Sequence, residues 1–415
     1  MSRKITVIVS HPGKQYVHQL LHALQRKNLL QLFITSIWFK PSLPFYKFLI
    51  GIPVIGKRLF DKFLKKKQYY LQNDQLIEQY PWKEFKRQIL VQFSTRYRGE
   101  KYVFQVERDH DVYVSKRLPE LSPAIFIGYE KSSLESFKIV KKSGGITVLD
   151  LAQVHFKYLE NLRIQEQTFT DLFEDETLFK TINKVKEEEY EQADYILTLS
   201  TFAKNTLIQN GIKESKIKVL NLGYSPDIFY PKSNYAESPG LNLIYTGTFT
   251  KRKGVELLLQ AIKELNLQNL NLVIIGPILD GADLFAKYSG LFTYYDFLHH
   301  EELVKHLRQS DVYVFPSYLD SWAMTVVEAM ACGLPVIVSE STGAKDAVIE
   351  GESGFIIPTG DLHSLKEKIL FFYNNKDKIK DMGDCAIKAA QIYTWENYYR
   401  EVEKAVSTIA KNHLN

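Results

Sequence analysis

The sequence is poor in cysteine and carries no large excess of charge of either sign. Only Cys332 and Cys385 occur among 415 residues, which excludes a disulfide framework or a cysteine-based metal cluster and indicates a reducing cytoplasm. The net charge of +5 is too small by itself to indicate nucleic acid as a partner, and none is expected. No convincing cluster of metal ligands is found, so no metal is expected either.

Long apolar runs are also missing. The longest one near the N-terminus, Phe48 to Gly56, is interrupted by Gly51 and Pro53 and falls well short of the roughly 20 residues that span a bilayer. The apolar run after the first four residues is short and ends at His11-Pro12-Gly13, so it is interpreted as a buried first strand rather than a signal peptide. A transmembrane helix is therefore not expected.

What is present is the composition of a folded, water-soluble protein, with 45% hydrophobic and 24% charged residues. The chain is longer than a single core usually supports, so two lobes are expected. Short β-branched runs alternate with amphipathic stretches, which is typical of parallel sheets covered by helices on both faces. The runs form two series, at 5–9, 124–127, 146–149, 195–199 and 216–220, and at 241–245, 272–275, 312–315, 336–338 and 355–357.

A turn-rich segment at 223–240 separates the two series and is interpreted as a linker. The sequence thus predicts an α/β protein of two Rossmann-like lobes whose parallel sheets face an interlobe cleft. We expect residues 1–225 to form the first lobe, residues 226–394 the second, and a C-terminal helix at about 395–415 to cross back onto the first. In open α/β sheets ligands bind beyond the carboxyl ends of the strands, so functional loops should follow strands.

The most informative segment runs from Phe315 to Val338 and reads FPSYLDSWAMTVVEAMACGLPVIV. A strand is expected to end at Phe315, and a helix is expected from about Thr325 to Cys332, before Gly333-Leu334-Pro335. Asp320 lies in the loop before the helix, and Glu328 follows eight positions later inside it. Exposed N–H groups at the start of the helix favour a phosphate.

This segment resembles the E-x7-E signature of the retaining glycosyltransferases of family four, commonly called group one, which have the two-lobed GT-B architecture. The resemblance implies that Asp320, in the first acidic position, lies beside the donor sugar and that Glu328 binds the ribose hydroxyls. It also implies that backbone amides between the two acids hold the sugar and diphosphate, namely those of Trp322, Ala323, Met324 and Thr325. Asp320 is shorter than the family's glutamate, and Ala323 stands where the family usually has glycine.

A second loop supports the same family. Residues 241–254 resemble the family's strand and G-R-x-x-x-x-K-G loop, in which arginine and lysine clamp the diphosphate; here Gly247 begins the loop and Lys253 takes the lysine position. Thr248 replaces the arginine, and Lys251 or Arg252 is a candidate to compensate. The loop lacks the G-K-[ST] ending of a nucleotide-triphosphatase P-loop, which disfavours kinase or ATPase chemistry.

The remaining site residues are also implied by the resemblance. Gly276 follows the strand at 272–275, and Leu298 lies in the expected base-binding loop at 297–303. Gly13 lies in the loop that approaches the diphosphate and acceptor. For the polar group of the first lobe that faces the reacting sugar, His155 is favoured over Asp150 because relatives often use a histidine.

Two segments carry charge patterns of their own. Residues 38–67 interleave aromatic and basic side chains, a composition typical of segments that bind anionic lipid, although a basic amphipathic helix packed on the first lobe fits equally well. Residues 165–192 are acidic and predict a long helix with a solvated face.

The predicted function is a retaining, metal-independent glycosyltransferase without a cofactor. It would use a UDP- or GDP-sugar donor and a lipid-linked or polysaccharide precursor as acceptor, in the cytoplasm or peripherally on the inner face of the membrane. Within enzymes, the alternatives are a nucleotide-sugar epimerase or a phosphorylase on the same architecture. A catalytically silent, membrane-associated subunit is the alternative of another class, suggested by Thr248, Ala323 and Asp320.

Overall fold

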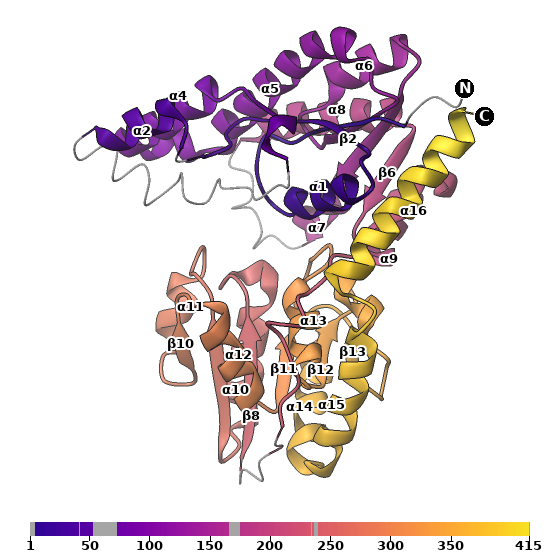
Figure 1. Ribbon diagram of the computed structural model, residues 1–415. Coiled ribbons are helices and arrows are strands. Elements are labelled where there is room, and N and C mark those ends of the chain that lie inside the picture. Colours follow the sequence, from indigo (N-terminus) through magenta and orange to yellow (C-terminus); the bar gives the residue numbers. More distant parts are fainter. Residues whose placement is uncertain are drawn as a thin grey trace.

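The computed structural model describes residues 5–40, 42–52, 73–165, 175–233, 235 and 240–414. Two lobes, each built around a parallel sheet, form the molecule (Figure 1). This confirms the predicted α/β class with two parallel sheets.

The first sheet has the order β3-β2-β1-β4-β5-β6-β7. Its strands are β1 (Val7–Ser10), β2 (Leu30–Thr35), β3 (Ile77–Gln79), β4 (Ile125–Tyr129), β5 (Ile146–Leu151), β6 (Tyr195–Thr198) and β7 (Ile217–Val219). The second sheet has the order β10-β9-β8-β11-β12-β13. Its strands are β8 (Leu241–Thr246), β9 (Leu270–Ile275), β10 (Thr293–Tyr295), β11 (Val312–Phe315), β12 (Val336–Ser339) and β13 (Gly354–Ile357).

The sequence prediction missed three strands, β2, β3 and β10. β3 and β10 are edge strands of three residues each, too short for a clear pattern, and they are held by pairing with β2 and β9 rather than by their own composition. β2 carries Gln31 in its run, which interrupts the β-branched signal. These three strands form because they pair with neighbouring strands of the sheets.

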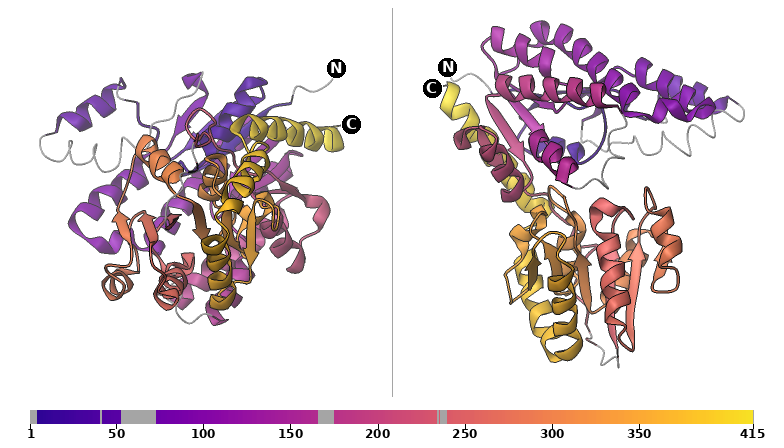
Figure 2. Two further views of the ribbon diagram at one scale, coloured as in Figure 1. Left: turned by 90° about the horizontal axis from the view of Figure 1, so that it is seen from below. Right: turned by 180° about the vertical axis from the view of Figure 1, so that it is seen from behind.

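Helices cover both faces of each sheet (Figures 1 and 2). Those of the first lobe are α1 (Val17–Arg26), α2 (Pro44–Gly51), α4 (Trp82–Phe93), α5 (Glu100–Leu121), α6 (Leu134–Lys142), α7 (Phe156–Gln165), α8 (Glu176–Gln192) and α9 (Thr201–Gln209). The later helices are α10 (Val255–Leu265), α11 (Ala282–Lys287), α12 (His300–Gln309), α13 (Met324–Ala331), α14 (Leu362–Asn374), α15 (Asp377–Ala390) and α16 (Trp395–Leu414). Within the described residues, none of the helices has the length and apolarity that crossing a bilayer requires.

The acidic stretch at 165–192 is a helix only in part and is not simply a solvated one. α7 ends at Gln165, α8 begins at Glu176, and residues 166–174 lie outside the described part. α8 buries Phe179 and Ile182 together with the charged Lys186 and Glu189. α8 does have a solvated face, on which Lys180, Lys184 and Glu187 are exposed, but its inner face also buries charged side chains whose partners the sequence does not reveal.

The C-terminal helix α16 leaves the second lobe and packs along α1 of the first (Figures 1 and 2). Arg26 of α1 donates two hydrogen bonds to the Glu396 carboxylate, at 2.7 and 2.9 Å, and Tyr399 donates one to Gln19. Where the chain first crosses between the lobes, Tyr224 forms a bridge with Thr394. Two crossings that lie side by side thus join the lobes.

The lobes also meet directly through polar contacts. The Ser321 hydroxyl donates to the Ala152 carbonyl oxygen across the interface at 2.5 Å. The backbone N–H and the hydroxyl of Thr201, at the start of α9, both donate to the Asp346 carboxylate of the second lobe. These contacts place the carboxyl end of β5 opposite the loop that precedes α13.

Candidate active site between the lobes

A cleft of about 400 Å³ lies where the carboxyl ends of the two sheets face each other. This volume is within the range of small-molecule sites, roughly 300–1,000 Å³. The first lobe contributes Gln15, Tyr16, Ala152, Gln153, Leu199 and Leu222. The second lobe contributes Thr246, Gly247, Thr248, Lys253, Phe315, Asp320, Ser321, Trp322, Ala323, Met324 and Thr325. Eight of the residues predicted for the site therefore share one cleft.

Asp320 is the acidic residue among those that line the cleft. Its carboxylate forms an ion pair with the Lys253 ammonium and accepts hydrogen bonds from the backbone N–H groups of Trp322, at 3.0 Å, and Ala323, at 2.9 Å. Burial alone would raise the pKa of Asp320, but Lys253 and these N–H groups outweigh it and hold the pKa below its usual range. Asp320 is therefore ionised at neutral pH.

Lys253 is delivered by a short 3₁₀ turn, η6 (Lys251–Lys253), that follows β8. The Thr250 hydroxyl caps this turn by accepting from the Lys253 N–H at 3.2 Å. Gly254 follows at φ 74°, and a Cβ there would collide with the Pro316 carbonyl oxygen. Only glycine fits between the two loops, and this close approach brings Lys253 to Asp320.

The helix α13 begins one residue earlier than predicted, at Met324, and Ala323 caps it in the left-handed region at φ 62° and ψ 72°. A residue with a Cβ adopts this conformation at a cost of roughly 1–2 kcal/mol. Ala323 thus keeps the backbone shape for which glycine is suited, and Met324 and Thr325, the first two residues of α13, line the cleft.

Glu328 lies on α13 outside the residues that line the cleft itself. Its side chain is half-buried and makes no hydrogen bond or ion pair with the rest of the described chain. Burial raises its pKa to about 7. A half-buried carboxyl group with free acceptor oxygens suits a partner that brings hydroxyl donors.

Gly247 and Gly276 lie against each other at the ends of β8 and β9. Gly276 adopts φ 143°, and a Cβ there would collide with the Gly247 carbonyl oxygen. Gly247 lines the cleft, whereas Gly276 does not. Because Gly276 has no Cβ, the Gly247 backbone can pack directly against it. Leu298 is half-buried against the core of the second lobe and does not line the cleft.

The residues predicted for the site from the first lobe do not line the cleft. His155 lies outside the cleft, in a separate cavity, where it packs on Phe156 and Tyr190 and its Nδ1 accepts from the Lys157 N–H. Burial lowers the pKa of His155 to about 4, so the ring is neutral. The structure therefore does not bring His155 toward Asp320.

Asp150 lies closer to the cleft than His155 does. It is the second-last residue of β5, is buried, and accepts a hydrogen bond of 2.6 Å from the hydroxyl of Tyr16, which lines the cleft. Burial raises the pKa of Asp150 to about 7. Sequence reasoning missed Tyr16 because nothing in a lone tyrosine after the first strand signals a partner 134 residues away.

Gly13 and Arg252 flank the cleft without lining it. The Gly13 N–H donates to His11 Nδ1 at 2.9 Å, which holds the loop after β1 in place. Arg252 donates to the Leu319 carbonyl oxygen at 2.8 Å and lines a second, adjoining cavity. No group of three or more histidine, cysteine or acidic side chains arranged to hold a metal ion occurs among the described residues.

The match to a known protein family falls on the second lobe. Residues 230–389 match the protein family described as glycosyl transferases group 1. The capsular polysaccharide biosynthesis glycosyltransferase CapM of Staphylococcus aureus is 28% identical over 237 residues, which make up 52% of this chain and 62% of CapM. The chain spans about 60% of the length of CapM and of the uncharacterized glycosyltransferase MJ1178 of Methanocaldococcus jannaschii.

Solved structures resemble the whole chain. The sucrose-phosphate synthase of Thermosynechococcus elongatus superposes with a TM-score of 0.69 and 18% identity, covering 99% of this chain and all of that one. HepE of Anabaena, solved in complex with UDP-glucose, gives a TM-score of 0.60 and 13% identity over 97% of this chain and all of its own. At these identities the likeness establishes the two-lobed fold.

Proposed function

Residues 230–389 match the glycosyl transferases group 1 family, the fold is shared with sucrose-phosphate synthase and HepE, and on this premise we propose that the chain moves a sugar from a nucleotide-sugar to an acceptor. Its relative CapM is named for capsular polysaccharide biosynthesis, and HepE was solved with UDP-glucose. The proposed donor is accordingly a UDP- or GDP-sugar. The proposed acceptor is a lipid-linked or polysaccharide precursor of a cell-surface glycan.

The observation that carries this proposal is the grouping of Lys253, Asp320 and the start of α13 in the interlobe cleft. An ammonium group and the N–H groups of a helix N-terminus suit a diphosphate, because they stabilise the negative charge that develops as it leaves. They supply positive charge without a metal, so the proposed reaction is metal-independent. Glu328, whose side-chain oxygens have no partner within the part of the chain that the structure describes, is the proposed partner of the ribose hydroxyls.

The proposed transfer retains the anomeric configuration. The bond between the anomeric carbon and the diphosphate oxygen breaks while the acceptor oxygen bonds to the same face of that carbon. The acceptor proton passes to the departing diphosphate, and Asp320 lies beside the sugar as its charge rises. Tyr16, held by Asp150, takes the first-lobe position for which His155 was predicted.

The test is product analysis with a panel of nucleotide-sugars, with and without acceptor glycans and with a chelator present. Nucleoside diphosphate release that requires an acceptor, with a retained anomer by NMR, supports the proposal. A changed sugar without any acceptor would instead indicate an epimerase, and the lack of donor binding in calorimetry would indicate a silent subunit.

The role of Lys253 in the proposed reaction is tested by comparing two lysine variants. Lys253→Met should lower kcat by about 10²–10³, the loss typical of one preorganised charge contact to the transition state. Lys378→Met removes an exposed lysine of α15 in the same lobe and serves as the control. Equal activity in the two variants would reject the role of Lys253.

We also propose contact with an anionic membrane near residues 38–67. Within the described part of this segment, Trp38, Phe39 and Tyr46 are buried, whereas Phe48 of α2 is 71% exposed. The neighbouring α4 exposes Trp82 and Phe93, at 61% and 79%. Aromatic side chains exposed beside lysines suit a lipid interface. The lysines and arginine at 57–67 lie outside the described residues.

A further inference from the structure

A separate cavity, of about 430 Å³, lies in the first lobe and shares no lining residue with the interlobe cleft. It is the cavity in which the structure places His155, directly before α7. The last two turns of α8 and the segment at 210–216, after α9, form its other walls. Its charged lining residues are Lys157, Glu187, Glu191, Lys213 and Lys216. The volume suits a small molecule distinct from the donor and the acceptor of the proposed transfer.

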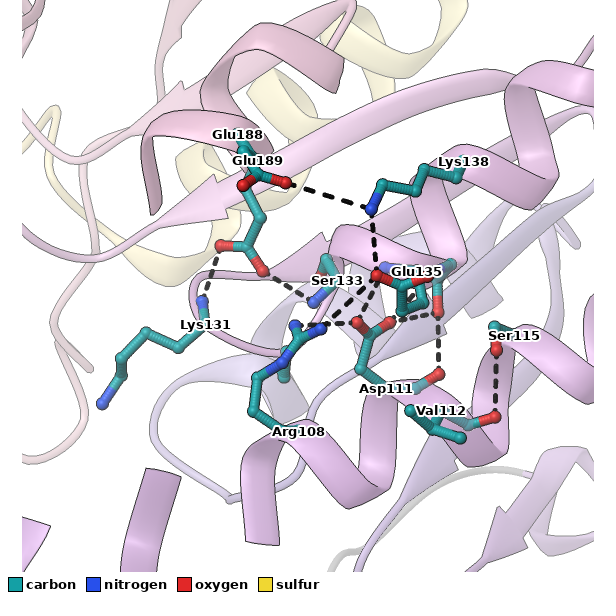
Figure 3. Close-up of polar contacts among 12 residues, drawn as sticks. Arg108, Asp111, Val112, Ser115, Lys131, Ser133, Glu135, Lys138, Glu188 and Glu189 are labelled. Atoms are coloured by element: carbon teal, nitrogen blue, oxygen red, sulfur yellow. Dashed lines mark hydrogen bonds and ion pairs between the residues drawn. The ribbon is translucent and has the colours of Figure 1, made fainter. Parts of the chain in front are cut away.

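α8 turns a fixed set of side chains toward this cavity. Its Glu189 carboxylate is fully buried on the other side of the helix and accepts hydrogen bonds from the N–H groups of Lys131, at 2.7 Å, and Ser133, at 2.8 Å (Figure 3). The next residue, Tyr190, is also buried and donates its hydroxyl hydrogen to Glu130. These contacts fix the rotation of α8 about its axis, so the wall that α8 provides is preorganised before a ligand arrives.

His155 carries a hydrogen-bond donor that the described chain does not use. The residue is 3% exposed, its backbone N–H donates to the Thr206 hydroxyl at 3.0 Å, and its ring packs on Phe156 and Tyr190. Nδ1 accepts from the Lys157 N–H at 3.1 Å, so in the neutral ring the proton is on Nε2. Nε2 makes no hydrogen bond within the described residues and is not closed off from solvent. An N–H at the wall of a cavity, with no protein acceptor, suits a ligand oxygen.

The lysines of the cavity are only partly neutralised, and with three lysines against two glutamates the lining carries an excess of positive charge. Lys157 pairs with Glu187 at 3.5 Å. Lys213 has no ion pair among the described residues, and Lys216 donates to the Ala193 carbonyl oxygen at 2.9 Å rather than to a carboxylate. Burial and nearby lysines, Lys213 among them, hold the pKa of Lys216 below its usual range. Two cations that repel each other at the wall of a cavity favour an anion between them.

We propose that this cavity binds the phosphate group of a small phosphorylated molecule. Lys213 and Lys216 pair with the phosphate, and the His155 Nε2–H donates to one of its oxygens. A phosphate monoester brings about two negative charges and three terminal oxygens, which match two ammonium groups and one N–H, whereas a carboxylate brings fewer of both. Phe156 and Ile212 provide apolar surface for the organic part of the ligand. The site is separate from the interlobe cleft and does not rest on the proposed transfer.

The full chain is titrated with phenyl phosphate, inorganic phosphate and benzoate. Calorimetry gives the Kd, and NMR follows the His155 ring, whose signal is assigned by its absence in His155→Phe. Phenyl phosphate should shift that signal and bind about tenfold more tightly than benzoate. Lys213→Met together with Lys216→Met should raise its Kd about tenfold or more, because two charge-assisted contacts are lost. Lys142→Met together with Lys184→Met removes two exposed lysines of the same lobe and should leave the Kd within about twofold.

A variant of the interlobe cleft shows which cavity holds the phosphate. Lys253→Met should keep both the Kd for phenyl phosphate and the shift of the His155 signal. The inference is overturned if benzoate binds as tightly as phenyl phosphate, if the two lysine pairs behave alike, or if Lys253→Met abolishes the shift. Inorganic phosphate with the same Kd as phenyl phosphate overturns the assignment to a phosphorylated organic molecule. Nucleotide-sugar binding should be unchanged by Lys213→Met with Lys216→Met, because these lysines lie outside the cleft, so the proposed transfer is tested separately.

Discussion

Replacing Glu328 by glutamine tests the electrostatics of the proposed donor site and its effect on the stability of the fold. The Glu328 carboxyl ionises near pH 4.5 in an unfolded chain and near pH 7 in the folded protein, because burial disfavours its charge. Between these values the unfolded chain has released its proton and the folded protein has not. Stability therefore falls as the pH rises from about 4.5 to about 7, and the loss persists above pH 7.

The size of the effect follows from the difference between the two pKa values. From 4.5 to about 7 is about 2.5 pH units, and at ~1.4 kcal/mol per unit this is at most about 3 to 4 kcal/mol. Glu328→Gln removes the ionisation. The variant should therefore gain stability relative to the unaltered protein as the pH is raised from 4.5 to 8, by up to that amount.

The assay is urea denaturation of both proteins at several pH values, with the midpoint and slope recorded for each. Glu352→Gln, which changes an exposed carboxylate in the loop before β13, is the control and should show no such trend. A stability difference between Glu328→Gln and the unaltered protein that is the same at pH 5 and pH 8 would refute the reasoning. On the proposed ribose role, donor affinity should fall at neutral pH, where a hydrogen bond to a charged acceptor is lost.

Two further predictions concern the backbone behind the site and the membrane. Gly276→Ala should lower the free energy of unfolding by about 2 kcal/mol or more, because its Cβ collides with the Gly247 carbonyl oxygen; Gly290→Ala, also at positive φ but with open space around it, should lose only the conformational part. Equal losses in urea denaturation would contradict the collision. Changing Lys57, Arg58, Lys62, Lys65, Lys66 and Lys67 to glutamine should reduce sedimentation with anionic vesicles without changing the thermal midpoint, and unchanged sedimentation would reject the membrane contact.

The second lobe could be predicted well because its signals are local. Asp320, the amides that follow it and Glu328 lie on one loop and one helix, so their spacing in sequence is nearly their spacing in space. Lys253 lies in the loop that follows β8, and β8 pairs with β11, the strand before the Asp320 loop. Its position could therefore be predicted from two neighbouring strands. The structure brings Lys253 to Asp320 as an ion pair, and eight predicted residues line a single cleft.

The first lobe could not be predicted in the same way because its contacts join distant parts of the chain. His155 and Asp150 stand five residues apart, and only the packing of α7, α8 and α9 shows that the histidine faces another cavity. Glu189 was part of a helix expected to be solvated, yet it holds a loop 56 and 58 residues away. No periodicity marks a carboxylate that pairs with backbone N–H groups.

The sequence by itself determined the alternation of strands and helices, the two lobes, and the acidic and basic residues of the second-lobe loops that line the cleft, because each of these depends on neighbours within a turn or a strand. Only the tertiary structure decided that Tyr16, held by Asp150, reaches the cleft and that the Glu328 side chain has no hydrogen-bond or ion-pair partner among the described residues. Those properties depend on burial and on contacts between residues far apart in sequence, and both arise only when the whole chain packs.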